Sequence, residues 1–542
     1  MKIFKVRWWI PVSLTLACAA AWLVVQHRSA MQTLNYEHST GLGVAVPSFD
    51  LLAKILPSTP QTRYEPLARQ RRVREMPGMG VAGGVPEASE SYRAIAEDAF
   101  AEAARDRLST FSIDVDTASY TNIRRYLRDG QRPPADAVRI EEMLNYFTYS
   151  YPDPAGPHPF SVTTEIAACP WTPANRLVRI GLKSKPIAAR DLPPSNLTFL
   201  IDVSGSMESP ERLPLVKRSF AMLVEQLRPQ DTVAVTVYAG NAGLVLPPTP
   251  GSQKTTILDA LERLEAGGST AGGAGIRQAY ATARQMYRAD ANNRVILATD
   301  GDFNVGVSSP EELIKLIESE RGRGIYLTAL GFGMGDMKDA TLQSLANHGN
   351  GQHAYVDSDL EARRMFVEQI GATLQTVAKD VKLQVDFNPA RVRSYRLIGY
   401  EKRKLTAEEF RDDRKDAGDL GAGHTVTALY EIVPEGGGAI GEDAFRVAIR
   451  YKDPRSDQAT EMTVNATPET ATPSADFRFA AAVAEFGMVL RDSAHKGGAT
   501  LESALRLASE NVKGDDRRAG LAKLIDQARV QVTAKAGYNG AQ

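Results

Sequence analysis

The hydrophobic and polar positions change their period along the chain, and this change divides the chain into parts. Between about residues 195 and 372, short buried runs alternate with segments whose apolar residues recur every three or four positions. Strands are predicted at 197–202, 231–238, 295–299 and 325–331, and helices at 213–227, 257–264, 276–287, 311–320 and 338–346. This alternation predicts an α/β domain with a doubly wound, mostly parallel sheet.

On both sides of this domain the apolar residues alternate with a period of two. The alternating segments are 160–166 and 178–182 before it, and 381–387, 426–432 and 445–451 after it. Alternation over such lengths is typical of antiparallel, half-buried strands. We expect the two sets to join in one β-sandwich into which the α/β domain is inserted.

Helical periods return at both ends of this arrangement. A strand is expected at 110–116, followed by helices at 120–127 and 140–147. Amphipathic helices are expected at 475–490, 500–508 and 518–530. Phe479, Val483, Phe486 and Leu490 mark the buried face of the first of these three, and core packing is their expected role.

The amino-terminal segment has the features of an export signal. Lys2, Lys5 and Arg7 precede an apolar run from 8 to 25, which is about the minimum length of a membrane span. The run favours an uncleaved single-pass anchor, while cleavage near Ala17-Cys18-Ala19 and a lipoprotein at Cys18 remain alternatives. In each case the basic end stays inside, so the bulk of the chain is expected in the periplasm or another extracytoplasmic space.

Residues 30 to 105 are rich in proline and glycine and are predicted to be a disordered linker. The composition, with 43% hydrophobic and 24% charged residues among 542, is that of a globular protein. A formal net charge of −1 gives no indication of nucleic-acid binding. Cys18 and Cys169 provide neither a disulfide framework nor zinc-ligand spacing.

Candidate metal ligands follow two of the predicted buried strands. Asp202 ends the strand at 197–202, with Ser204 and Ser206 at alternate positions after it, and Asp300 directly follows the run at 295–299. Thr270 adds a hydroxyl from a glycine-rich loop. Open α/β sheets bind their ligands at the carboxyl ends of such strands. Carboxylates and hydroxyls are hard oxygen ligands, suited to Mg²⁺ or Mn²⁺.

These five positions resemble the metal-ion-dependent adhesion site of the von Willebrand factor A (VWA) domain, D-x-S-x-S followed by T and D. The flanking segments resemble those of a family of bacterial exported VWA proteins, with a characteristic region before the VWA domain and a C-terminal domain of unknown function. The resemblance implies a Rossmann-like VWA domain. The expected parts are a signal anchor (1–29), the linker (30–105), an N-terminal VWA-associated region (106–194), the VWA domain (195–372), a C-terminal β-domain (373–465) and a helical region (466–542).

The resemblance implies protein–protein recognition through the metal. Three of the ligands are neutral hydroxyls, so an Asp or Glu carboxylate of a protein partner can supply both the missing ligand and the missing charge. In VWA domains, closure of the site can shift the last helix, which is expected here at 360–370.

Two other functions remain alternatives. A metal-dependent, phosphatase-like hydrolase needs a base near the metal, and Asp302 is the candidate. An adaptor of an ATPase complex needs a cytoplasmic VWA domain. Asp114 and Asp116 resemble the D-x-D loop of haloacid-dehalogenase-type phosphatases, but Ala118 stands where that pattern has Thr or Val. We expect Asp116 or Thr117 instead to cap the following helix. No catalytic residues are assigned.

Overall fold

The computed structural model describes residues 92–268, 272–301, 309–333, 339–454, 456–512 and 514–539. All of them belong to the compact unit that runs from Arg72 to Gln542. None of the described helices combines the length and the apolar character needed to cross a bilayer. The predicted anchor at 1–29 lies outside the described residues, as does most of the predicted linker.

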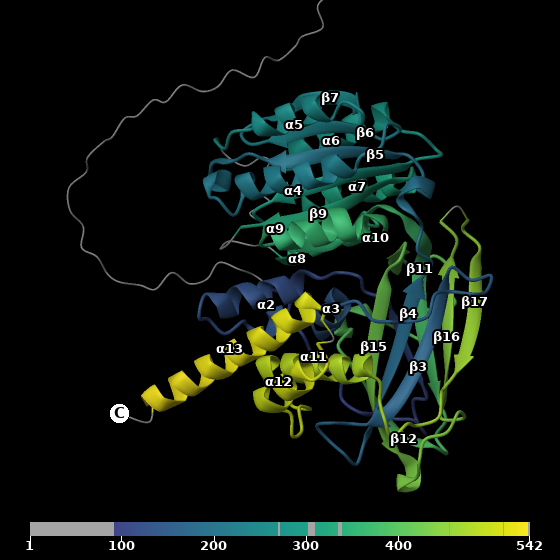
Figure 1. Cartoon of the computed structure of the whole chain (residues 1–542). Helices are drawn as coiled ribbons and strands as arrows, with labels where there is room; N and C mark the ends of the chain where they lie inside the picture. The colour runs from purple at the N-terminus through teal and green to yellow at the C-terminus, as the bar shows by residue number, and fades with distance from the viewer. Residues whose placement is uncertain are drawn as a thin grey trace, which may run out of the picture. The chain divides into compact units, whose positions relative to one another are not determined.

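The VWA domain is built on one six-stranded sheet in the order β10-β9-β8-β5-β6-β7 (Figure 1). All neighbouring strands are parallel except β6 and β7, which are antiparallel. The strands are β5 (Ser195–Asp202), β6 (Thr232–Tyr238), β7 (Ala242–Pro250), β8 (Asn292–Thr299), β9 (Ile325–Phe332) and β10 (His353–Val356). The predicted doubly wound, mostly parallel sheet is confirmed.

Helices cover both faces of this sheet because its strands are apolar on both sides. In β8, Ile296 and Ala298 pack with α4 (Leu213–Gln226) and α5 (Lys254–Glu262). Val295 and Leu297 face the opposite way, toward α6 (Gly272–Gln285), α7 (Pro310–Gly322) and α8 (Asp339–His348). Two cores therefore hold the strands, and with them the strand ends, in fixed positions.

The end of the VWA domain differs from the single helix predicted at 360–370. A short helix, α9 (Asp359–Arg363), is followed by a π-helical turn at Arg364–Glu368 and then by α10 (Ile370–Leu374). Within the turn, Gln369 N donates to Arg364 O at 2.9 Å, so five residues replace the usual four.

Strands from both sides of the VWA domain form the β-sandwich, as predicted. One sheet has the order β1-β12-β15-β4-β3 and the other β13-β2-β11-β16-β17, with β14 paired to β11. The strands before the VWA domain are β1 (Ala101–Glu102), β2 (Leu108–Ser112), β3 (Phe160–Ala168) and β4 (Arg176–Ser184). Those after it are β11 (Thr376–Phe387), β12 (Val392–Ile398), β13 (Lys404–Leu405), β14 (Gly418–Gly421), β15 (Thr425–Pro434), β16 (Phe445–Lys452) and β17 (Ala459–Asn465).

The pairing shows that neither half of the sandwich is complete alone. β11 lies between β2 and β16, and β15 lies between β4 and β12. β1 pairs with β12 through Ala101 and Glu102, so ordered structure begins before residue 105, where the linker was predicted to end. Glu97 also contacts Arg491 at 3.3 Å.

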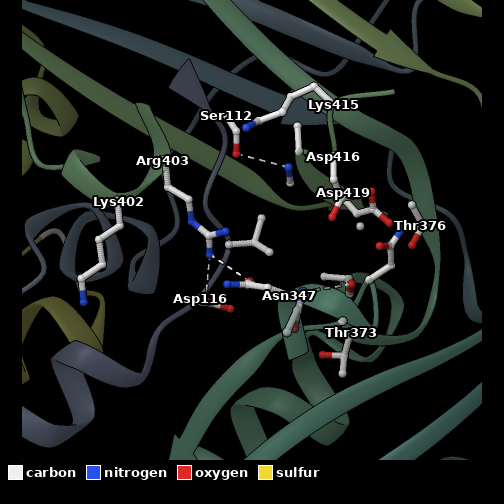
Figure 2. A pocket seen from close by; sticks show the side chains of 18 of the residues that line it. Ser112, Asp116, Asn347, Thr373, Thr376, Lys402, Arg403, Lys415, Asp416 and Asp419 are labelled. Atoms are coloured by element: carbon white, nitrogen blue, oxygen red, sulfur yellow. Dashed lines mark hydrogen bonds and ion pairs between the residues drawn. The ribbon is translucent and has the colours of Figure 1, made fainter. Parts of the chain in front are cut away.

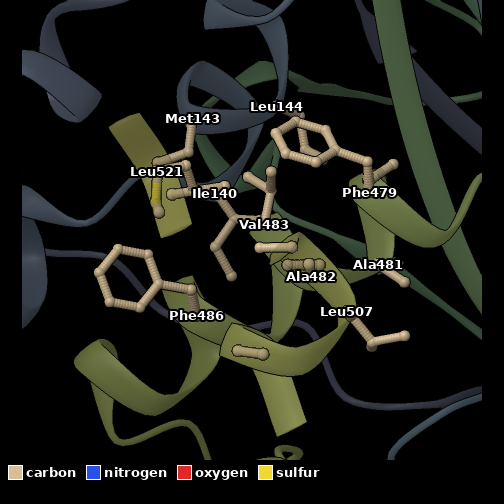
Figure 3. Packing of buried hydrophobic residues seen from close by; sticks show 14 of the residues in the cluster. Ile140, Met143, Leu144, Phe479, Ala481, Ala482, Val483, Phe486, Leu507 and Leu521 are labelled. Carbon is tan, nitrogen blue, oxygen red and sulfur yellow. The ribbon is translucent and has the colours of Figure 1, made fainter. Parts of the chain in front are cut away.

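A helical layer completes the fold. α11 (Ala475–Arg491), α12 (Leu501–Ser509) and α13 (Asp516–Asn539) pack with α2 (Ala118–Arg128) and α3 (Ile140–Tyr146). Figure 3 shows Val483 and Phe486 of α11 beside Ile140 and Met143 of α3. The predicted buried residues of α11 are confirmed, but nearly the whole helix is buried rather than one face.

Candidate metal centre

Asp202 and Asp300 lie at the same edge of the VWA sheet because their strands are direct neighbours. Every residue of β5 is buried up to Asp202, its last position, and Asp300 follows the end of β8. The two strands run parallel, with Ile201 opposite Ala298. The apolar runs thus carry both carboxylates to the carboxyl edge of the sheet, as predicted.

Asp202 is fully buried, and hydrogen bonds hold its carboxylate in place. Its Oδ1 accepts from the backbone N–H of Ser204 at 2.9 Å, and its Oδ2 accepts from Thr299 Oγ1 at 3.0 Å. Burial raises the pKa of Asp202, and repulsion from Asp300 adds to this rise. A cation between the two carboxylates would remove both costs.

The two serines stand beside this carboxylate. Ser204 Oγ and Ser206 Oγ are 3.0 Å apart, with Ser204 buried and Ser206 exposed. A short 3-10 turn at Gly205–Glu208 carries Ser206 outward. The loop therefore offers one hydroxyl from within the site and one from its rim.

The glycine-rich loop is attached directly to the Asp202 loop. Gly205 N donates to Gly268 O at 3.0 Å, and Gly267 N donates to Val203 O at 2.7 Å. Gly268 has a φ of +82°, which favours glycine. Thr270, the fifth predicted ligand, lies outside the described residues, as does Asp302, the candidate base of the hydrolase alternative.

Sequence reasoning missed Arg212, which contacts two sides of the site. Its Nη1 donates to Asp300 Oδ2 at 2.8 Å and to Ser206 O at 2.6 Å. A Cβ on Gly333, at the tip of β9, would lie 2.2 Å from Arg212 Cγ, so the glycine makes room for the arginine. Nothing in the local pattern before α4 distinguishes Arg212 from other arginines, because its partner is 88 residues away.

The donor set fits a hard divalent cation. The Asp202 carboxylate stands beside the hydroxyls of Ser204 and Tyr238, which can turn their protons away when a cation binds. Two carboxylates and two hydroxyls are all-oxygen ligands of the kind that Mg²⁺ and Mn²⁺ prefer. The assignment of Asp202, Ser204, Ser206, Thr270 and Asp300 as metal ligands stays a prediction.

A second acidic cluster lies in the N-terminal region, where Asp114, Asp116 and Glu142 bring carboxylate oxygens within 4.8 Å of one another. Arginine side chains already neutralise the negative charge of this cluster. Arg403 donates to Asp114 at 2.8 Å and to Asp116 at 3.0 Å, as Figure 2 shows for Asp116. Arg139 pairs with Glu142. We therefore assign this cluster to packing rather than to a metal.

The predicted cap of α2 is wrong. Thr117 makes no capping hydrogen bond, and Asp116 Oδ1 instead accepts from His353 N at 2.8 Å. The N–H of Ser119 donates to Glu142 Oε2 at 2.9 Å, so a carboxylate from α3 takes the place of a local cap. The Asp116 carboxylate thus joins the N-terminal region to the VWA domain.

Three models of known protein families match parts of the chain between residues 86 and 530. The model described as von Willebrand factor type A domain matches residues 196–370. A model described as von Willebrand factor matches 86–179, and one described as Uncharacterized protein YfbK, C-terminal, matches 372–444 and 438–530.

Individual relatives agree with these matches. Uncharacterized protein YfbK of Escherichia coli (strain K12) is 39% identical over 459 residues, which cover 80% of each chain. Human inter-alpha-trypsin inhibitor heavy chain H3 is 27% identical over 194 residues, or 34% of this chain and 22% of that protein. The solved structure of von Willebrand factor type A from Catenulispora acidiphila is similar at 20% identity and a TM-score of 0.40, covering 68% of this chain and 90% of that one. The chain therefore belongs to the YfbK family of VWA-domain proteins.

Proposed function

We propose that this protein is a membrane-anchored, exported VWA protein that binds a protein partner through a divalent metal. Asp202, Ser204, Ser206, Thr270 and Asp300 would hold Mg²⁺ or Mn²⁺. An Asp or Glu carboxylate of the partner would complete the coordination. The proposal includes no enzymatic activity.

One observation carries the proposal: two carboxylates and two hydroxyls meet at the carboxyl edge of β5 and β8. VWA domains commonly mediate protein–protein contacts, often through a metal held at this position. When bound, the metal would attract an anionic side chain, since two carboxylates leave coordination positions unfilled. Asp202 would anchor the ion from the buried side, and exposed Ser206 would stand toward the partner.

The proposed location depends on the amino-terminal sequence. The basic residues before the apolar run from 8 to 25 support a cytoplasmic amino end and an extracytoplasmic VWA domain. A reporter enzyme that works only in the cytoplasm, fused after residue 542, should be inactive. An active fusion would contradict the topology and favour the ATPase-adaptor alternative.

The test of partner binding is affinity capture from membranes with Mg²⁺ and again with a chelator. The parent should retain a defined protein only with Mg²⁺, and Asp202→Ala should not retain it. Asp290→Ala is the matched control, because Asp290 is an exposed aspartate of the same domain that pairs with Arg288. If the partner is retained equally in the presence of the chelator and by Asp202→Ala, the proposal is refuted. Phosphate-ester hydrolysis that requires Mg²⁺ and Asp202 would favour the hydrolase alternative.

A further inference from the structure

A second candidate site lies where the VWA domain meets the β-domain. A cavity of about 200 Å³ opens there, near the amino end of β8, whereas Asp300 follows the carboxyl end of the same strand. Its lining includes Arg294, Asn347, Thr373, Thr376, Asp416 and Asp419. Figure 2 shows the labelled side chains of the VWA domain and the β-domain around this space.

Arg294 is a buried cation with no direct ion pair among the described residues. Its side chain is 3% exposed, and its Nη1 donates to the neutral hydroxyl of Thr328 at 2.8 Å. The guanidinium lies 5.5 Å from the ring centre of Tyr326. Its Nε is buried and has no hydrogen-bond partner, and no carboxylate of the described residues forms an ion pair with it.

Such an arrangement is costly unless something else compensates the charge. Buried guanidinium groups are normally paired, because removing the charge from water costs several kcal/mol. Burial lowers the pKa of Arg294 to about 10, which still leaves it charged at neutral pH. An anionic group in the cavity would supply the missing partner.

Most other charged groups of the lining already have partners. The ion pairs are Arg403 with Asp114 and Asp116, Asp416 with Arg321, Lys415 with Glu409, and Lys404 with Asp98. In Figure 2 the amine of Lys402 points away from Asp416 and Asp419. Lys402 Nζ also lacks a hydrogen-bond partner, but Arg294 is the cation of the lining that interacts with the charge of Asp419.

Asp419 supplies the complementary acceptor. Its Oδ1 accepts from Asp380 N at 3.2 Å, while its Oδ2 is buried without a hydrogen-bond partner. Burial, with repulsion from Asp380, raises the pKa of this carboxyl to about 7. Asp419 and Arg294 interact through their charges but form no direct ion pair. A ligand with its anionic group at Arg294 and its cationic group at Asp419 would compensate both side chains of the lining.

We propose that this cavity binds a small amino acid, with the ligand carboxylate on Arg294 and the ligand amine on Asp419. The volume exceeds that needed for a water molecule by about tenfold. It is below the range of about 300–1,000 Å³ typical of drug-sized ligands, so the ligand has few heavy atoms. Arginine suits the role because its planar group binds a carboxylate through two N–H donors.

The test measures binding of glycine, β-alanine and γ-aminobutyric acid to the full chain by calorimetry. These three place the carboxylate and the amine at increasing separation. Acetate and methylammonium, at equal ionic strength, each carry only one of the two groups. At least one amino acid should bind about tenfold more tightly than acetate, a difference of about 1.4 kcal/mol.

Two variants assign the binding to the cavity. Arg294→Gln should lose it, and Asp419→Ala should bind the amino acid no more tightly than acetate. Arg288→Gln is the matched control, because it removes an exposed arginine of the same domain and should leave binding unchanged. If none of the three amino acids binds the parent, or if the parent and Asp419→Ala bind them equally, the proposal is wrong. The comparison of the parent with Asp419→Ala tests the proposal even if Arg294→Gln does not fold.

Discussion

At the residue scale, Arg212 is the feature that most affects the proposed metal site. Its guanidinium pairs with Asp300 at 2.8 Å and is largely buried. A metal held by Asp300 would therefore lie near a fixed positive charge. Two unit charges about 6 Å apart repel by ~3 kcal/mol at an effective dielectric constant of 20, and solvent screening reduces this value.

We predict that Arg212→Gln raises the affinity for Mg²⁺ by about tenfold, corresponding to about 1.4 kcal/mol of relieved repulsion. Calorimetric titration of the full chain measures this change. Arg218→Gln is the control, since Arg218 also belongs to this helix region but pairs with Asp359 at the exposed surface. Equal or weaker Mg²⁺ binding by Arg212→Gln would show that the arginine supports the site rather than opposing it.

Glu485 leads to a prediction about pH. It is 1% exposed within α11, its Oε2 has no hydrogen-bond partner, and burial raises its pKa from 4.5 to about 7. The folded state therefore favours the protonated form. The stability that this proton contributes is complete below pH 4.5 and is lost as the pH rises through 7.

Glu485→Gln keeps the shape of the side chain but replaces the titratable carboxyl with a neutral amide. Compared with the parent, the variant should gain up to ~3 kcal/mol of unfolding free energy between pH 4.5 and pH 8, at 1.36 kcal/mol per pKa unit. Denaturant unfolding of both proteins at the two pH values measures this gain. A difference in unfolding free energy between the two proteins that is the same at both pH values would contradict the prediction.

Local sequence predicts residue positions when the cause is local. Asp202 and Asp300 could be placed because the apolar runs before them determine where each strand ends. Arg139 could not be placed, although it is fully buried and binds Asp339 at 2.8 Å, because that partner is 200 residues away. The cap at Thr117 was predicted wrongly for the same reason, since Glu142 on α3 supplies the acceptor.

At the element scale, the close packing of α11 on α3 depends on Gly487. A Cβ at this position would lie 2.8 Å from Ile140 Cγ1 and 3.2 Å from Met143 Sδ. A Cβ on Gly520, in α13, would have no neighbouring atom within 4 Å. The two glycines therefore differ in packing while sharing a helical backbone.

We predict opposite effects of alanine at these glycines. Gly520→Ala should stabilise the protein by about 0.5–1 kcal/mol, because alanine favours the helix. Gly487→Ala should destabilise it, since overpacking typically costs about 1–3 kcal/mol. Chemical denaturation of the two variants beside the parent measures both effects. A stabilising Gly487→Ala would show that α11 and α3 can separate without cost.

Sequence periods predicted the long elements but not the irregular ones. β8 and α11 have strong patterns. β7 was missed because Pro247, Pro248 and Pro250 interrupt it, which an antiparallel edge strand tolerates. β10 has only four residues, too few for a period. The π-helical turn at Arg364–Glu368 has no simple signal, so the last VWA helix was predicted to be continuous.

At the scale of the whole molecule, the sandwich connects segments that are distant in sequence. Val385 of β11 lies opposite Ser109 of β2, and Tyr430 of β15 lies opposite Val178 of β4. Matching periods on both sides of the VWA domain predicted this insertion. They could not predict the strand order, because half-buried strands of similar length could pair in several ways.

We predict that residues 195–372 fold alone, whereas residues 376–465 do not. The first fragment contains the complete VWA sheet and, apart from Leu374, both of its cores. The second lacks β2 and β4, so β11 and β15 would each expose an unpaired edge. Thermal unfolding followed by circular dichroism measures both fragments. A cooperative transition in 376–465 would contradict the dependence of the sandwich on both flanks.

The metal site is the central claim, and calorimetric titration of Mg²⁺ or Mn²⁺ into the full chain tests it most directly. The parent should bind one ion, and Asp202→Ala should lose this binding while keeping its thermal unfolding, since Asp202 supplies one of two assigned negative charges. Thr270→Ala should bind more weakly but still bind, because both charges remain. Asp290→Ala, at an exposed position, should match the parent. Equal metal affinity of Asp202→Ala and the parent would contradict the assigned site and the partner binding proposed from it.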